Sequence, residues 1–261
     1  MLILGANGGM VVSAKKRHLY FLAVIVLLFT ARASAQGWRT RVWPTTPDNV
    51  EYPTQLTGWL IVIDPGHGGS DSGAVNKNLN LKEKDIVLAV GLKLRTALQD
   101  LGARVEMTRD TDKSMLISER YTLANNLHAH RLVSLHNNAA NTTAEGIETW
   151  VDSDAPQVWK NYASSLHRNT ISAAKAYDSS IRDRGIKYSG TTPPWSGKKI
   201  GVINYANIKC PAALLELNFI DNDKEANRLI RDDYQRALAN GMANGFLEHA
   251  SQYNKEDGLK Y

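Results

Sequence analysis

The segment Trp59–Gly69, with the sequence WLIVIDPGHGG, decides how the chain is interpreted. The apolar run from Trp59 to Ile63 predicts a buried strand. This strand leads directly into a loop whose glycines permit a tight turn, and the loop presents His67. A phosphate-binding loop and a plain turn are the alternatives, but neither a GK[ST] sequence nor an immediate helix follows. The segment therefore predicts a strand whose end carries a candidate ligand.

Downstream of this strand, short apolar runs alternate with amphipathic stretches. The recurrence of Ile86, Val90, Leu94 and Leu98 predicts a helix that begins near Glu83. Further strands are expected at 104–108, 132–135, 147–151 and 212–217, and further helices at about 116–129, 157–177 and 234–249. Strands that alternate with helices of this length predict an α/β fold, with a single domain around one mostly parallel sheet.

The first 35 residues have the three parts of a secretory signal peptide. Lys15, Lys16 and Arg17 precede an apolar run from Leu19 to Phe29, and Ala33-Ser34-Ala35 supplies the small residues before a cleavage point. A membrane anchor is the alternative, but a spanning helix needs about 20 apolar residues. We therefore expect an exported protein, periplasmic or secreted, with no stable membrane anchor after the leader, residues 1–35, has been removed.

The rest of the chain is expected to comprise an extended lead-in at 36–56, a catalytic domain at 57–250 and a polar C-terminal tail at 251–261. The formal net charge of +5 falls to +1 without the four basic residues of the leader, so nucleic acid is not an expected partner. The single cysteine, Cys210, excludes an intramolecular disulfide framework. It precedes a proline and an apolar strand and is interpreted as a buried small apolar residue.

Two further polar residues suggest a metal site. His136 closes the apolar run that ends at Leu135 and is followed by a polar stretch, whereas a core histidine would be expected among apolar residues. Glu83 begins a helix just after the loop that carries His67; a favourable charge at a helix N-terminus is the alternative explanation for it. Because ligand sites form beyond the carboxyl ends of parallel strands, these residues are expected at one rim together with Asp64. Two histidines and one carboxylate form a common catalytic zinc set with a coordination position left for water.

Glu216 interrupts an otherwise apolar strand, from Ala212 to Leu217. An unpaired carboxylate buried there is costly, so the side chain needs a partner or must face a cleft. A buried salt bridge is one interpretation. The other is a general base next to the metal site, with its pKa shifted towards the operating pH.

Several stretches resemble the zinc-dependent N-acetylmuramoyl-L-alanine amidases of the amidase-3 type. They occur in the order and spacing of that family between about Leu60 and His249: IVIDPGHGGSDSGAV, KEKDIVLAVGLKLRTAL, VEMTRDTD, ERYTLANN, LVSLHNNAAN, GIETW and LLELNFIDN. The resemblance implies a twisted sheet of about six strands with helices on both faces. It also implies one zinc ion (Zn2+) per chain, with His67, Glu83 and His136 as its ligands, and Glu216 as the catalytic glutamate.

The activity implied by the resemblance is hydrolysis of the amide bond between N-acetylmuramic acid and the L-alanine of the stem peptide, with peptidoglycan or a muropeptide as substrate. The ligands alone do not select the amide, so a zinc peptidase or deacetylase acting on another amide is an alternative. A catalytically inactive wall-binding module is a second alternative, although all four chemical residues are present.

The chain departs from the family pattern at three places. Asn137 replaces the usual alanine after the second histidine, and Asn218 replaces a glycine or similar residue; both are interpreted as affecting substrate fit. The stretch Gly190–Lys199 is longer than in minimal members and is expected to be a substrate-side loop with an aromatic platform or a surface turn. Arg109, Arg120 and Asp112 are expected to have structural roles around the site.

Overall fold

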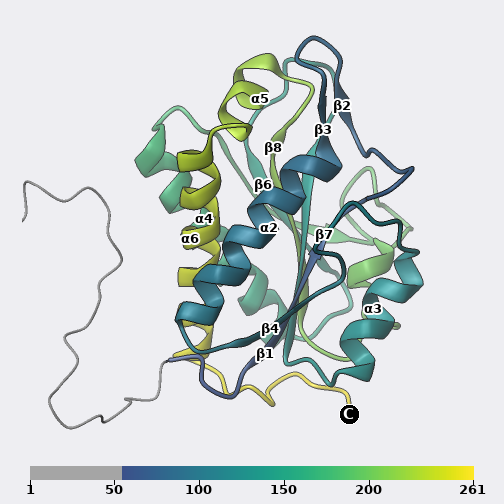
Figure 1. Cartoon of the computed structure of the whole chain (residues 1–261). Helices are drawn as coiled ribbons and strands as arrows, with labels where there is room; N and C mark the ends of the chain where they lie inside the picture. The colour runs from purple at the N-terminus through teal and green to yellow at the C-terminus, as the bar shows by residue number, and fades with distance from the viewer. Residues whose placement is uncertain (1–54) are drawn as a thin grey trace, which may run out of the picture. The chain divides into compact units, whose positions relative to one another are not determined.

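The computed structural model describes residues 55–261 (Figure 1). The predicted leader and nearly all of the predicted lead-in lie outside the described residues. Leu56, which was assigned to the lead-in, is fully buried and donates its backbone N–H to the carbonyl of Leu101. The packed domain therefore already includes Leu56. Across residues 55–261, no helix combines the length and apolar character needed to cross a bilayer.

A six-stranded sheet forms the centre of the domain (Figure 1). Its strands follow the spatial order β4-β1-β5-β8-β6-β7. In chain order they are β1 (Leu60–Pro65), β4 (Arg104–Met107), β5 (Arg131–Asn138), β6 (Ile147–Asp152), β7 (Asp183–Ser189) and β8 (Ala212–Phe219). All neighbouring strands are parallel except β6 and β8. The prediction of a mostly parallel sheet of about six strands is confirmed.

Helices cover both faces of this sheet, as predicted. Figure 1 shows α2 (Glu83–Asp100), α4 (Gln157–Tyr177) and α6 (Asp232–Ala250) on one face and α3 (Ile117–Asn126) on the other. The four apolar residues that predicted α2, from Ile86 to Leu98, are all buried. They recur every four residues, which is the spacing of one helix face, and this explains why α2 packs with that side inward.

Five elements were not predicted. They are β7, the short helix α5 (Asp223–Leu229), the 3-10 helix η1 (Gly201–Ile203), and the two strands β2 (Val75–Asn76) and β3 (Leu81–Lys82), which form a hairpin. Strand β7 pairs only with β6 and lies at the edge of the sheet, so its sequence DRGIKYS has no apolar run. The other elements are too short for hydrophobic periodicity to be recognised.

The C-terminal tail is packed against the domain. Arg131, at the start of β5, is fully buried and donates hydrogen bonds to the backbone carbonyls of Asn254 and Lys255. Trp159 Nε1 donates to the carbonyl of Gly258 at 2.9 Å. The tail therefore supplies acceptors to buried donors, although most of its own side chains are polar. Cys210 is buried as predicted.

Candidate metal centre and active site

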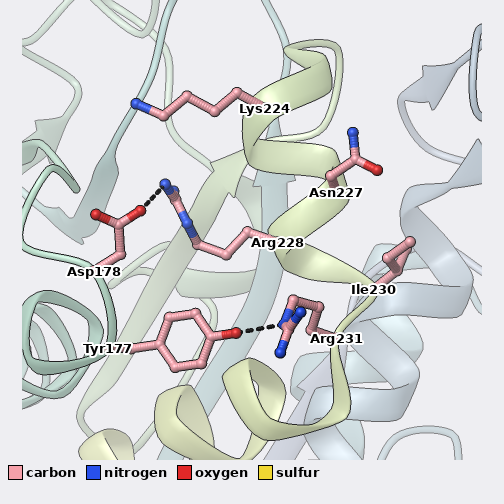
Figure 2. Close-up of a pocket in the computed structure, with 7 residues that line it drawn as sticks. All are labelled: Tyr177, Asp178, Lys224, Asn227, Arg228, Ile230 and Arg231. Atoms are coloured by element: carbon pink, nitrogen blue, oxygen red, sulfur yellow. Dashed lines mark hydrogen bonds and ion pairs between the residues drawn. The ribbon is translucent and has the colours of Figure 1, made fainter.

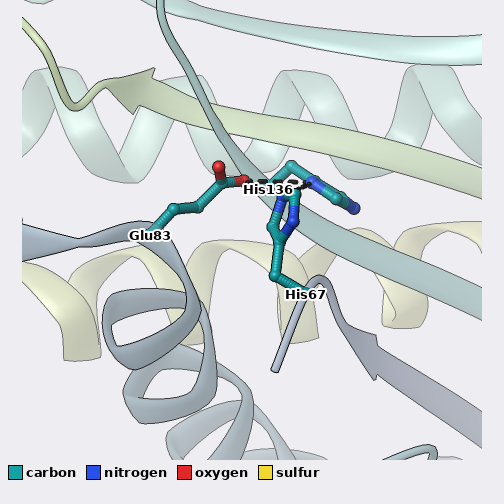
Figure 3. A group of neighbouring side chains, drawn as sticks. All are labelled: His67, Glu83 and His136. Atoms are coloured by element: carbon teal, nitrogen blue, oxygen red, sulfur yellow. Dashed lines mark hydrogen bonds and ion pairs between the residues drawn. The ribbon is translucent and has the colours of Figure 1, made fainter. Parts of the chain in front are cut away.

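His67, Glu83 and His136 converge at the carboxyl ends of β1 and β5 (Figure 3). His67 comes from the loop after β1, Glu83 is the first residue of α2, and His136 lies near the carboxyl end of β5. His67 Nε2 and His136 Nδ1 lie 3.1 Å apart. Glu83 Oε1 lies 3.1 Å from the first of these nitrogens and 3.0 Å from the second. Three atoms with lone pairs thus form a nearly equilateral triangle.

This triangle has the dimensions of one face of a tetrahedral metal site. Zinc ligands at about 2.0–2.1 Å from the ion, in tetrahedral arrangement, are about 3.3 Å from one another. The observed separations of 3.0–3.1 Å are close to this value. The donor set of two imidazole nitrogens and one carboxylate oxygen is also one that zinc prefers in catalytic sites. The residues present therefore fit a zinc ion.

Neighbouring groups orient two of the three side chains, those of His67 and Glu83. His67 Nδ1 lies 2.9 Å from Asp71 Oδ2, the arrangement in which a carboxylate fixes the tautomer of a metal-binding histidine. Glu83 Oε2 accepts the backbone N–H of Ala74, and Glu83 Oε1 accepts that of Asn137. This contact of Asp71 was not predicted from the sequence.

The pKa values of Glu83 and His67 are shifted by their neighbours. Burial alone would raise the pKa of Glu83, but hydrogen bonding and attraction to His136 and His67 outweigh it and lower that pKa strongly. Burial likewise opposes protonation of His67, whereas Glu83 and Asp71 raise its pKa. The site thus holds an ionised carboxylate next to a basic imidazole, and a metal ion at this position would compete with a proton.

The backbone around His67 is shaped for this arrangement. His67 itself has a φ of +61°, the left-handed region that residues with a side chain adopt at a cost. A Cβ atom at Gly66 would lie 2.3 Å from the ring of His136, and one at Gly73 would lie 2.5 Å from Glu83 Oε2. The glycines therefore allow the loop to approach the two other ligands.

Two buried arginines hold the carbonyl groups of the His67 loop, and this confirms the structural role expected for them. Arg120 Nη2 donates to the carbonyl of His67 at 2.7 Å, and its Nη1 pairs with Asp64 Oδ1 at 2.8 Å. Arg109 donates to the carbonyls of Pro65 and Gly66.

Asp64 was expected at the rim, but its side chain is fully buried beneath the loop, where it anchors Arg120. Asp112 accepts hydrogen bonds from the backbone N–H of Gly69 and from Lys84 Nζ.

Glu216 lies next to the triangle formed by His67, Glu83 and His136. In the sheet register it is the direct partner of His136 on one side and of Glu148 on the other. Its Oε2 atom is buried and has no hydrogen-bond partner within residues 55–261, which argues against the salt-bridge interpretation. Burial, together with the charges of Glu83 and Glu148, raises the pKa of Glu216 well above its ordinary value. The side chain is thus an acid whose free oxygen has no protein partner in the described part.

Two residues of this rim, Glu148 and Arg184, were not predicted as functional. Glu148 is buried on β6 and accepts hydrogen bonds from Asn138 Nδ2, Trp150 Nε1 and Arg184 Nε. Its sequence signal is the same as that of Glu216, an acid within an apolar strand. Arg184 lies on the unpredicted strand β7 and gave no such signal.

Two departures from the family pattern are buried residues, Asn137 and Asn218. Asn137 donates its backbone N–H to Glu83 Oε1, and the side chain of Asn218 is bonded to Glu225 and Tyr234. Their influence on substrate fit stays a prediction. The 190–199 loop follows the carboxyl end of β7, where Lys199 binds Asp152. Because β6 runs antiparallel to β8, this is the opposite end of the strand pair from Glu148. The placement favours a surface turn over a substrate-side loop.

A separate surface depression lies between the end of α4 and α5 (Figure 2). Its charged groups are already paired: Arg228 binds Asp178, and Arg231 Nε donates to the hydroxyl of Tyr177. None of the predicted site residues lines it. We therefore assign the chemistry to the rim that carries His67.

Comparison with known proteins identifies the family. The amidase-3 family, described as N-acetylmuramoyl-L-alanine amidase, matches residues 61–248. The chain belongs to this family. It is 34% identical over 197 residues to the sporulation-specific N-acetylmuramoyl-L-alanine amidase of Bacillus subtilis. The matched region covers 75% of this chain and 69% of that protein.

Solved structures of amidases have the same fold. An N-acetylmuramoyl-L-alanine amidase from Clostridium difficile gives a TM-score of 0.67 at 33% identity, with 75% of this chain and 98% of that chain covered. The catalytic domain of CwlV, an amidase from Bacillus (Paenibacillus) polymyxa var. colistinus, gives 0.65 at 31% identity, with 75% and 99% covered. The chain is thus an N-acetylmuramoyl-L-alanine amidase in fold and family.

Proposed function

We propose that the enzyme is a zinc-dependent amidase in which His67, Glu83 and His136 hold one zinc ion per chain. The observation that carries this proposal is the triangle of ligand atoms, 3.0–3.1 Å apart, next to the unpartnered oxygen of Glu216. The orienting contact of Asp71 with His67 supports it, because a metal-binding histidine almost always donates its other ring N–H to a carboxylate, a backbone carbonyl or water.

A zinc ion held by His67, Glu83 and His136 would supply Lewis acidity, which would polarise the scissile carbonyl and lower the pKa of water. Glu216 acts as the general base: its free Oε2 accepts a proton from the attacking water and later donates it to the departing amide nitrogen. The raised pKa of this carboxyl favours the second transfer, and a bound dication would favour the ionised form needed for the first. Asp71 and Arg120 keep His67 in place throughout.

The bond cleaved joins the lactyl group of N-acetylmuramic acid to L-alanine, and the substrate is peptidoglycan or a muropeptide. Peptidoglycan lies outside the cytoplasmic membrane, so we propose that the enzyme is exported and that residues 1–35 are removed as a signal peptide. N-terminal sequencing of the mature protein is expected to begin at Gln36. A mature protein that retains the leader would contradict this part of the proposal.

Digestion of purified peptidoglycan tests the activity and its alternatives. The amidase is expected to release stem peptides with a free L-alanine amino terminus, which mass spectrometry identifies. New termini within the peptides would indicate a peptidase, and free amino groups on the sugars a deacetylase. An enzyme that contains no zinc and releases nothing would instead be a wall-binding module.

A further inference from the structure

Four polar side chains form a row across neighbouring strands at the rim of the sheet. His136 on β5 is the register partner of Glu216 on β8, and Glu216 is that of Glu148 on β6. Arg184 on β7 extends the row, because its Nε donates to Glu148 Oε2 at 2.7 Å. The row therefore runs from the metal-binding triangle to the edge of the sheet, and its last member is a cation.

A β-bulge directs Arg184 towards this row. The register passes from Ile147 opposite Asp183 to Glu148 opposite Gly185, which leaves Arg184 as the extra residue of β7. Bulges next to active sites commonly re-aim a side chain out of the regular pleat. The hydrogen bond from Arg184 Nε to Glu148 shows that the side chain of Arg184 points towards this row.

The guanidinium of Arg184 is held in one orientation. Its Nε is bound to Glu148, and its Cζ lies 4.8 Å from the centre of the Phe219 ring. Glu148 has further donors in Asn138 and Trp150, so it does not need the terminal nitrogens of the arginine. Within residues 55–261 those two nitrogens make no hydrogen bond, and 30% of the side chain is exposed. The protein therefore presents a fixed guanidinium with free donors.

We propose that Arg184 binds a carboxylate of the stem peptide, so that the peptide part of the substrate runs from the metal-binding triangle towards β7. This inference rests on the proposed function. A guanidinium with two free terminal nitrogens matches a carboxylate in a two-point contact. In the intact substrate the lactyl carboxyl is consumed in the scissile amide and the N-acetylated sugars are uncharged, so a carboxylate can come only from the peptide.

The spacing of the row selects a residue near the scissile bond. Neighbouring strands lie about 4.8 Å apart, and an extended peptide advances about 3.3 Å per residue. Arg184 contacts Glu148, one strand beyond Glu216. A carboxylate on the residue after L-alanine therefore comes within reach when the scissile amide lies next to Glu216. In a peptidoglycan stem this is the α-carboxylate of the second residue, D-glutamate.

A pair of substrates that differ in one group tests the inference. N-acetylmuramoyl-L-alanyl-D-glutamate with a free α-carboxylate is compared with its α-amide, and kcat/KM is measured for both. The wild-type enzyme is expected to favour the carboxylate by about 10- to 100-fold, as for a lost hydrogen bond to a charged group, chiefly through KM. Arg184→Gln is expected to bring the ratio close to one, and Arg184→Lys to retain part of it. The matched control is Arg182→Gln, at an exposed position two residues earlier, which should keep the wild-type ratio.

The ratio is measured within each variant, so it does not depend on how much folded enzyme is present. Equal rates on both substrates in the wild type would overturn the inference and leave the proposed function intact. A wild-type ratio that persists in Arg184→Gln, or in Arg184→Met if the glutamine variant does not fold, would overturn it too, and would assign Arg184 a purely structural role. Cleavage of neither substrate would overturn the proposed function itself.

Discussion

His136 and Glu216 are register partners on the neighbouring parallel strands β5 and β8. Partners in adjacent strands point to the same face of the sheet at the same height. The proposed metal ligand and the proposed base are therefore held side by side by backbone hydrogen bonds and not by a loop. Their different surroundings separate their roles: the imidazole lies 3.0 Å from Glu83, whereas Glu216 Oε2 has no partner within residues 55–261.

Replacement of a proposed ligand should remove the metal and the activity together. His136→Ala deletes one corner of the triangle, so stoichiometric zinc and hydrolysis of muropeptides are both expected to be lost. Metal analysis of the purified protein and an amidase assay check this. His128→Asn is the matched control, since His128 is exposed and outside the triangle, and it should keep both. Full zinc occupancy in His136→Ala would remove this residue from the ligand set.

Glu216→Gln should separate catalysis from metal binding. The glutamine keeps the shape of the side chain but cannot accept a proton, so turnover should fall by at least about 10²- to 10⁴-fold. Zinc content should stay at the wild-type level because the three ligands are intact. Parallel loss of zinc would instead indicate that Glu216 is a ligand, and turnover close to that of the wild type would end its assignment as the base.

The raised pKa of Glu216 predicts a dependence of stability on pH in the metal-free protein. An acid whose pKa is higher in the folded than in the unfolded state disfavours folding once the pH exceeds the unfolded value, about 4.3. The free energy of unfolding of the wild type should therefore fall relative to that of Glu216→Gln as the pH rises from 5 to 8. Denaturant unfolding of both proteins after treatment with a chelator measures this difference in the free energy of unfolding. A difference that does not change with pH would contradict the prediction.

Arg120 should be required for the stability of the domain. Arg120→Met leaves Asp64 buried without its charged partner and removes the donor to the His67 carbonyl. Breaking a buried ion pair from one side costs about 3–5 kcal/mol, and zinc affinity should fall as well. Denaturant unfolding and zinc titration check both effects.

Two further variants test whether the broken ion pair between Arg120 and Asp64 causes this loss of stability. Arg236→Met removes an exposed arginine from its pair with Asp232, so it should change the free energy of unfolding by less than about 1 kcal/mol. Adding Asp64→Asn to Arg120→Met should recover part of the loss, since the orphaned charge is then removed. A destabilisation by Arg120→Met no larger than that by Arg236→Met would show that the pair contributes little.

Much of the fold was predictable because buried strands and the helix α2 have strong apolar patterns. The three residues of the triangle were also predictable, since His67 follows one apolar strand, His136 lies at the end of another, and Glu83 begins a helix after the loop that carries His67. The direction of β6 was not, because an apolar run carries no sign of whether it runs parallel or antiparallel to its neighbours. For the same reason the pairing of Glu148 with Glu216 could not be expected, and Arg184 is on an edge strand with no apolar run to identify it.

The antiparallel step between β8 and β6 also bears on how the enzyme could be attached to a support. It places the carboxyl ends of β6 and β7, with the 190–199 loop, at the end of the sheet opposite the metal-binding triangle. Tyr205, whose backbone N–H binds Asp152 there, accepts a hydrogen bond from Lys260 of the C-terminal tail. An affinity tag or a surface tether joined after Tyr261 would therefore leave the rim open to a polymeric substrate.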